Sequence, residues 1–171
     1  MSSEDTVLSL VREIVERAIE DRAFFRINRD PVFRPGASEP DIARLKKLWR
    51  HPLPDEYLNL LRAHDGIDNF DAPNMFLLST KHILDNPEMD EIFVDAEMFR
   101  EGEIFIFCQA DHDAHSVAFR ASRKGKVDVV DFDSGGIHQQ HEDFVSYLES
   151  RKAQLGKDIA RHKADRKGLT R

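Results

Sequence analysis

Apolar residues recur at helical spacing in several stretches of the chain. Residues 4–21 place eight of them on one face, which predicts an amphipathic helix. Residues 38–49 and 54–63 have the same period, and each stretch starts with residues that favour a helix start. The acidic and aromatic residues 142–148 predict a fourth helix. Between the first two helices, the aromatic and proline residues of 24–36 predict an extended connector.

The ends of the two central helices are marked in the sequence. Ser38 is a predicted N-cap, and Asp41 follows three residues later, as in a capping box. Pro54 suits the first turn of the next helix, where its missing N–H costs nothing. Gly66 can adopt the left-handed conformation that ends a helix. Each of these two helices is therefore predicted with its boundaries.

Short runs of β-prone residues predict strands at 75–78, 103–108, 117–120 and 127–133. The last two runs are predicted to form an antiparallel hairpin about residues 122–125. Residues 92–99 have a mixed period that favours neither helix nor strand. Helices grouped before and after the strands predict an α+β fold. We expect an antiparallel or mixed sheet of about four to six strands, flanked by N-terminal helices and a C-terminal helix.

Charge is distributed unevenly over the 171 residues. The net charge is −7, but residues 1–150 contain 30 acidic and 17 basic residues, a net charge of −13. Residues 151–171 have eight basic residues and two acidic ones. We therefore expect three regions: an N-terminal helix and connector (1–37), a domain (38–150) and a basic tail or helix extension (151–171). The acidic body disfavours nucleic acid and favours a basic protein partner.

Two classes of protein are disfavoured by composition. No apolar run approaches the roughly 20 residues of a membrane span, and residues 1–5 lack the features of a secretory signal, so we expect a cytoplasmic protein. The single cysteine, Cys108, excludes an internal disulfide. Its apolar neighbours predict a buried strand position, where cysteine behaves as a small hydrophobe.

The order of these elements resembles the SUKH superfamily, which includes regulators of yeast cell-wall synthesis and many bacterial immunity proteins. The resemblance covers residues 38–150. It depends on the helix ending in Trp49, the helix start at residues 53–57, the stop at Asp65-Gly66, the strand at 127–133 and the closing helix at 144–148. Many relatives have Asn-Gly-Gly where this chain has His64-Asp65-Gly66, and residues 80–102 are longer and more helical than in the family.

Residues 111–115 are the segment most like a metal site. Asp111, His112, Asp113 and His115 offer carboxylate and imidazole ligands within five residues. A polar loop between two strands is the competing interpretation, and we favour it. For His138 and His141 we expect a loop or a helix cap. No segment supplies a nucleophile, a base and an orienting group together, so we expect no enzyme, no metal and no cofactor.

The resemblance implies a binding function, namely an immunity protein that docks on a bacterial toxin domain. Many toxins neutralised by the superfamily are nucleases, whose basic clefts would complement an acidic body. The expected contacts are acidic residues near the strand loops: Asp65, Asp68, Asp71, Asp111, Asp113, Asp131 and Asp133. The alternatives are a regulatory scaffold that binds a host protein, and a small metal-dependent hydrolase that uses Asp111, His112, Asp113 and His115.

Overall fold

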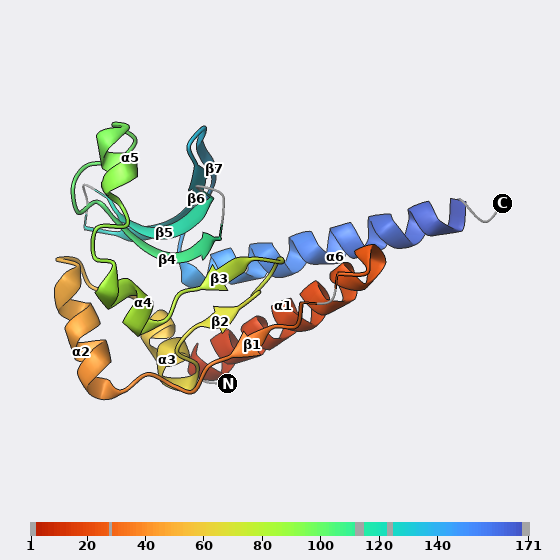
Figure 1. Ribbon diagram of the computed structural model, residues 1–171, viewed down its shortest axis with the longest axis horizontal. Coiled ribbons are helices and arrows are strands. Elements are labelled where there is room, and N and C mark those ends of the chain that lie inside the picture. Colours follow the sequence, from red (N-terminus) through yellow and green to blue (C-terminus); the bar gives the residue numbers. More distant parts are fainter. Residues whose placement is uncertain (1–2, 28, 112–114, 123–124, 169–171) are drawn as a thin grey trace.

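Helices precede, interrupt and follow one antiparallel sheet in the computed structural model, which describes residues 3–27, 29–111, 115–122 and 125–168 (Figure 1). The helices are α1 (Ser3–Phe25), α2 (Glu39–Leu48), α3 (Asp55–Ala63), α4 (Thr80–Asp85), α5 (Glu91–Asp95) and α6 (Phe144–Gly168). The strands are β1 (Val32–Phe33), β2 (Ile67–Asp68), β3 (Met75–Leu77), β4 (Ile104–Ala110), β5 (Ser116–Ala121), β6 (Val127–Asp133) and β7 (Gly136–His141). Within the described residues the strands are neighbours in chain order.

The predicted α+β class is confirmed, and the described strand pairs are all antiparallel. The sheet has seven strands in the described chain, more than the expected four to six. β1 and β2 have two residues each, too few to produce an alternating pattern. The prediction of a loop or helix cap at His138 and His141 is wrong, because both residues belong to β7. Among the described strands, β7 pairs with β6 alone. Its side chains are mostly exposed, and its sequence lacks the apolar alternation of a half-buried strand.

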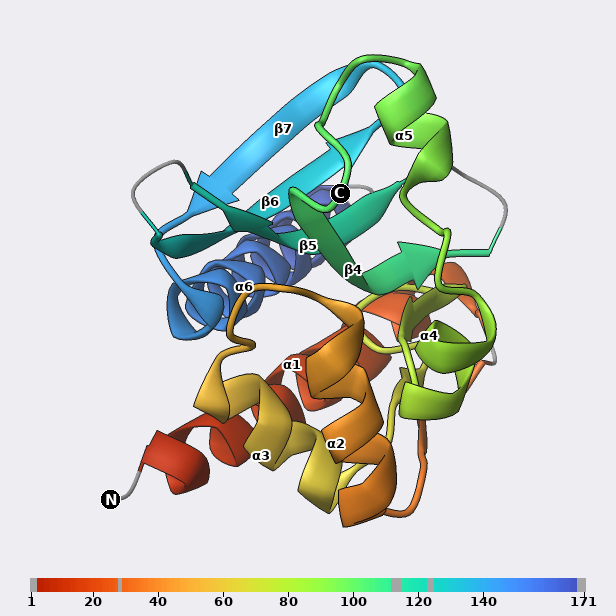
Figure 2. The same ribbon diagram turned by 90° about the vertical axis from the view of Figure 1, so that its left-hand side faces the viewer.

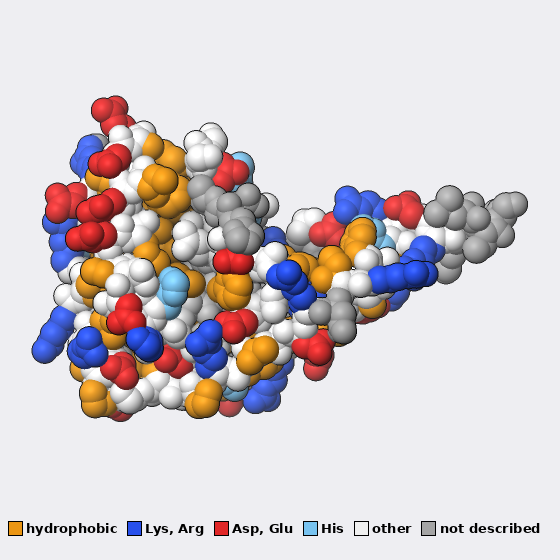
Figure 3. Space-filling model, viewed as in Figure 1, with side chains coloured by type: hydrophobic (Ala, Val, Ile, Leu, Met, Phe, Trp, Pro, Cys, Tyr) orange, Lys and Arg blue, Asp and Glu red, His pale blue; other side chains and the backbone are white. Residues whose placement is uncertain are grey.

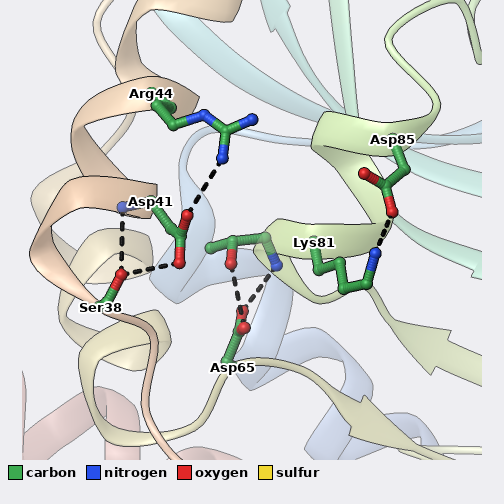
Figure 4. A network of polar contacts seen from close by, with 7 residues as sticks. Ser38, Asp41, Arg44, Asp65, Lys81 and Asp85 are labelled. Carbon is green, nitrogen blue, oxygen red and sulfur yellow. Dashed lines mark hydrogen bonds and ion pairs between the residues drawn. The ribbon is translucent and has the colours of Figure 1, made fainter.

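Local signals place the central helices as predicted. The Ser38 hydroxyl accepts a hydrogen bond from the Asp41 backbone N–H and donates one to the Asp41 carboxylate, at 3.3 and 2.7 Å (Figure 4). Such a cap satisfies a backbone donor that a helix start leaves free. α3 follows Pro54 directly, with Asp55 and Glu56 in its first turn. Residues 92–99, which had no clear period, begin within the short helix α5.

Tyr57 of α3 is the centre of an aromatic core. Its ring is fully buried and contacts Phe105, Phe107, Phe119 and Phe144, with ring centroids 5.1–6.3 Å apart. These partners belong to β4, β5 and α6. Aromatic pairs of this kind contribute about 0.5–1.5 kcal/mol each beyond their burial. The stripe of apolar residues predicted on α3 therefore joins the sheet to the C-terminal helix (Figure 2).

The segment around α5 covers part of the opposite face of the sheet. Phe93 of α5 and Phe99 pack on Phe132 of β6, with ring centroids 4.8 and 4.9 Å apart. All three rings are buried. These contacts hold α5 and the residues after it against the sheet (Figure 2). Most polar side chains of this segment are exposed.

α1 and α6 run side by side and extend beyond the rest of the molecule (Figure 1). The basic residues after position 150 continue α6, and Leu155 and Ile159 are buried although apolar residues are few there. Ion pairs join the two helices, Lys152 with Glu13 at 3.3 Å and Lys163 with Glu20 at 2.6 Å. Part of the positive charge of the C-terminal stretch is thus matched by the acidic residues of α1.

Two inferences from composition agree with the described structure. None of its helices is both long and apolar enough to cross a membrane. Cys108 lies fully buried on β4, as predicted, and burial raises the pKa of its thiol well above the usual range. The thiol is therefore protonated and enclosed, which makes it a poor nucleophile.

Gly66 stands where the chain leaves α3 and enters β2. Its φ of +92° is in the left-handed region, and an added Cβ would lie 2.8 Å from the Leu77 oxygen and 2.9 Å from the Ser79 nitrogen. We expect Gly66→Ala to lower the free energy of unfolding by about 1–3 kcal/mol, measured by urea denaturation. Gly125→Ala is the matched control, since Gly125 has a φ of +74° and open space around it. Equal losses in both variants would show that crowding at Gly66 is unimportant.

Candidate protein-binding surface

The seven predicted contact residues lie in different parts of the structure. Asp65 is a structural cap: its carboxylate accepts hydrogen bonds from the backbone N–H and the hydroxyl of Thr80, at 2.6 and 3.0 Å. These bonds anchor the first turn of α4 to the end of α3 (Figure 4). Asp68 on β2 forms an ion pair with Arg34 at 2.9 Å. Both carboxylates are therefore already engaged within the chain.

Three more of these residues lie at loops beside the sheet. Asp133 is 2.8 Å from His138, and this hydrogen bond lowers the pKa of the Asp133 carboxyl. Asp111 follows β4 and is exposed. Asp113 lies outside the described residues. Asp111 is exposed and the Asp133 side chain is partly exposed, so both can be reached from solvent, and their role in binding stays a prediction.

Asp71 and Asp131 come together beside α6, although 60 positions separate them in the sequence. Asp71 accepts a hydrogen bond from the Arg151 Nε at 2.7 Å, and Asp131 lies 2.7 Å from the Nε2 of His115. Burial alone would lower the pKa of Arg151, but the charge and hydrogen bond of Asp71, together with nearby Tyr147 and Asp131, raise that pKa overall. Arg151 is therefore a permanent cation in this cluster.

The His115–Asp131 pair predicts a pH dependence. The hydrogen bond to Asp131 outweighs burial and raises the His115 pKa above its ordinary value of 6.5. A raised folded-state pKa means that protonated His115 stabilises the fold below about pH 6.5, and this contribution disappears as the pH rises through the higher value. We expect an NMR titration to give a lower His115 pKa in Asp131→Asn than in wild type. Asp85→Asn removes an exposed carboxylate that pairs with Lys81, and it should leave the His115 titration unchanged. Equal pKa values in wild type and Asp131→Asn would contradict the assignment.

The metal interpretation of residues 111–115 receives no support from the described part of this loop. His112 and Asp113 lie outside the described residues, and His115 is bound to Asp131. Among the described side chains, no group of three or more His, Cys, Asp or Glu is arranged to hold a metal ion.

A stronger concentration of acidic residues lies between α4 and β4, and it was not among the predicted contacts. Residues 88–101, here called the acidic segment, contain six carboxylates and one basic residue, Arg100. Five of the six carboxylate side chains are exposed: Glu88, Glu91, Asp95, Glu97 and Glu101. Acidic side chains gather over α5 and the loops beside it, next to hydrophobic side chains (Figure 3).

A groove of about 340 Å³ lies between the acidic segment and the rest of the domain. Buried Trp49, Ile83 and Phe105 contribute apolar surface to it, and half-exposed Leu48 lines it as well. Glu88 and Glu101 line the same groove. An apolar floor beside several carboxylates suits an apolar anchor residue that is surrounded by basic residues.

Hydrogen bonds from the chain after α2 fix the acidic segment in place. The Trp49 indole N–H donates to the Gly102 oxygen at 3.0 Å, and Arg50 donates to the Glu101 oxygen at 2.9 Å. Within the segment, Asp90 is half-buried, and burial followed by the nearby Glu101 charge raises its pKa. The acidic side chains are thus presented on backbone that is anchored at one end.

A simple sequence signal could have identified this surface. The predicted contacts lie near strand loops, whereas the density of acidic residues is highest in residues 88–101. These residues belong to the unusually long segment 80–102.

The described residues form a small α+β domain. Its surface has a groove with an apolar floor, lined on one side by the acidic segment. The model of the SMI1 / KNR4 family (SUKH-1) matches residues 36–150, about two thirds of the chain. The chain belongs to this family, and the predicted resemblance to the SUKH superfamily is confirmed. A search of curated proteins finds no match. Family membership supports a protein-binding role, as an immunity protein or as a regulatory protein.

Proposed function

We propose that this protein is an immunity protein that neutralises a bacterial toxin by binding it directly, without catalysis. The observation that supports this proposal best is the acidic segment beside the apolar groove. Negative charge at such a surface speeds encounter with a basic partner, and apolar anchor residues supply most of the affinity. We propose a nuclease toxin as the partner, because the cleft in which a nuclease binds its substrate is basic. Neutralisation would take place in the cytoplasm of the producing cell.

The exposed aspartates near the strand loops complete the proposed surface. Asp111 is exposed, and the Asp133 side chain is 39% exposed although it pairs with His138, so we propose that these two contact the rim of the partner. The other four described aspartates have partners within the chain, namely Asp65, Asp68, Asp71 and Asp131. We propose that they act through the negative electrostatic field of residues 1–150. Asp113 is proposed from the sequence alone.

A regulatory scaffold is the second candidate, because the family match supports a regulatory role equally. Such a scaffold would use the same groove for a host protein. The neighbouring genes distinguish the two candidates: an adjacent toxin gene favours immunity, and a solitary locus favours the scaffold.

The proposal is tested by capture of partners from lysate of the source cells. The tagged protein is retained on resin, and the bound polypeptides are identified and quantified by mass spectrometry. We expect a toxin-bearing polypeptide at a ratio near one to one. Recovery of host regulatory proteins at that ratio, with no toxin, would favour the scaffold and contradict the immunity proposal.

A further inference from the structure

A second cavity lies between the β2–β3 loop, the ends of β5 and β6, and α6. Its volume is about 210 Å³. Since a water molecule takes about 30 Å³ in the liquid, the cavity has room for about seven waters. A single structural water would leave most of it empty. The cavity is lined by other residues than the groove, so an inference about it is independent of the proposed function.

One wall of this cavity contains the positively charged side chain of Arg151, which Asp71 holds in place. Arg151 lines the cavity with a side chain that is 23% exposed, whereas the side chain of its partner Asp71 is 1% exposed. The Asp71 carboxylate binds the Nε of Arg151 and so holds the plane of the guanidinium. A guanidinium has five N–H donors, and within the described residues the Nη groups of Arg151 have no hydrogen-bond partner.

The opposite charge comes from β6. Asp131 lines the cavity and uses one carboxylate oxygen for His115; in the described chain its Oδ2 has no hydrogen-bond partner. His115 is 41% exposed and lies beside it. The buried Oδ1 of Asp71 also has no hydrogen-bond partner among the described atoms. Buried polar groups normally have partners, so this set of free donors and acceptors indicates a ligand or ordered water.

We propose that the cavity binds a small zwitterionic α-amino acid, with its carboxylate on Arg151 and its ammonium on Asp131. Arg151 would repel an ammonium ion alone, and Asp131 would repel a carboxylate alone. A zwitterion pairs both groups, and a guanidinium can bind a carboxylate through two parallel hydrogen bonds. An amino acid with a small side chain has no more non-hydrogen atoms than the roughly seven waters that the cavity holds. The ligand class is therefore amino acids of the size of glycine, alanine or serine.

The test is isothermal titration calorimetry of the full chain with glycine, L-alanine and L-serine. Methylammonium chloride and sodium acetate serve as the separate halves of the zwitterion. Asp131→Asn removes the charge that faces the ammonium, and Arg151→Lys keeps the charge but removes the planar donors. Asp133→Asn is the matched control, since Asp133 pairs with His138 and does not line the cavity. Circular dichroism confirms that each variant is folded.

We expect at least one amino acid to bind saturably and one to one, with a dissociation constant of about 10 mM or below. Asp131→Asn and Arg151→Lys should each weaken it about tenfold or more, and Asp133→Asn should leave it unchanged. The absence of saturable binding by any of the three amino acids would overturn the proposal and leave ordered water in the cavity. Undiminished binding in Asp131→Asn, or methylammonium binding as tightly as glycine, would also overturn it.

Discussion

We expect replacement of Glu88, Glu91 and Glu101 with lysine to slow association with the proposed partner by about ten- to a hundredfold at low ionic strength. All three side chains are exposed and line the groove. Reversing them changes the charge at the groove by about six units in a place where long-range attraction guides encounter. Stopped-flow or surface-plasmon measurements at several salt concentrations give the rate. The difference between wild type and variant should shrink as salt rises, because salt screens exposed charges.

A control variant distinguishes the effect of charge at the groove from the effect of the net charge of the protein. Lysine at Glu16, Glu149 and Asp165 gives the same change in net charge on α1 and α6, where these acidic side chains are also exposed. We expect this control to associate nearly as fast as wild type. A similar loss of rate in both variants would mean that only net charge matters, and an unchanged rate in the groove variant would remove the acidic segment from the binding surface.

Asp71→Asn lowers the free energy of unfolding by about 3–5 kcal/mol. Asp71 is buried and its charge balances Arg151, so the amide leaves a largely enclosed guanidinium without compensation. For a chain of this size the loss corresponds to a decrease of roughly 10 °C in Tm. Urea denaturation and differential scanning calorimetry measure both quantities.

Two further variants test the cause of this loss. Asp85→Asn removes an exposed partner of Lys81, and we expect its unfolding transition to match that of wild type. The double variant Asp71→Leu with Arg151→Met removes both charges, so it should recover much of the stability that Asp71→Asn loses. A small effect of Asp71→Asn, similar to that of Asp85→Asn, would contradict a structural role for the buried pair.

The elements that were predicted correctly are those with local signals. Ser38 and Pro54 mark helix starts through interactions within a few residues, and these predictions agree with the structure. Gly66 has the predicted positive φ in the turn that follows α3. β1 and β2 could not be predicted, because they are short and exist through pairing with distant residues. β7 was missed for a related reason: its polar residues resemble a loop, and backbone bonds to β6 define it as a strand.

The site was less predictable than the fold. The sequence offers several acidic residues in loops, but it does not show which of them have partners within the chain. Asp71 pairs with Arg151, 80 positions away, and such a contact follows from the packing of α6 against the β2–β3 loop. The acidic segment was visible as charge density, yet its groove depends on Trp49 and Ile83, which approach it only in the folded chain.

The most direct test of the proposed function is a titration of toxin activity with the purified protein. The toxin domain obtained by capture is assayed at a fixed concentration while wild type, the groove variant or the α1–α6 control variant is added. We expect wild type and the control to abolish activity near one molar equivalent, and the Glu88, Glu91 and Glu101 variant to require a large excess. Full toxin activity at a large excess of wild type, or equal inhibition by the groove variant, would contradict the immunity proposal.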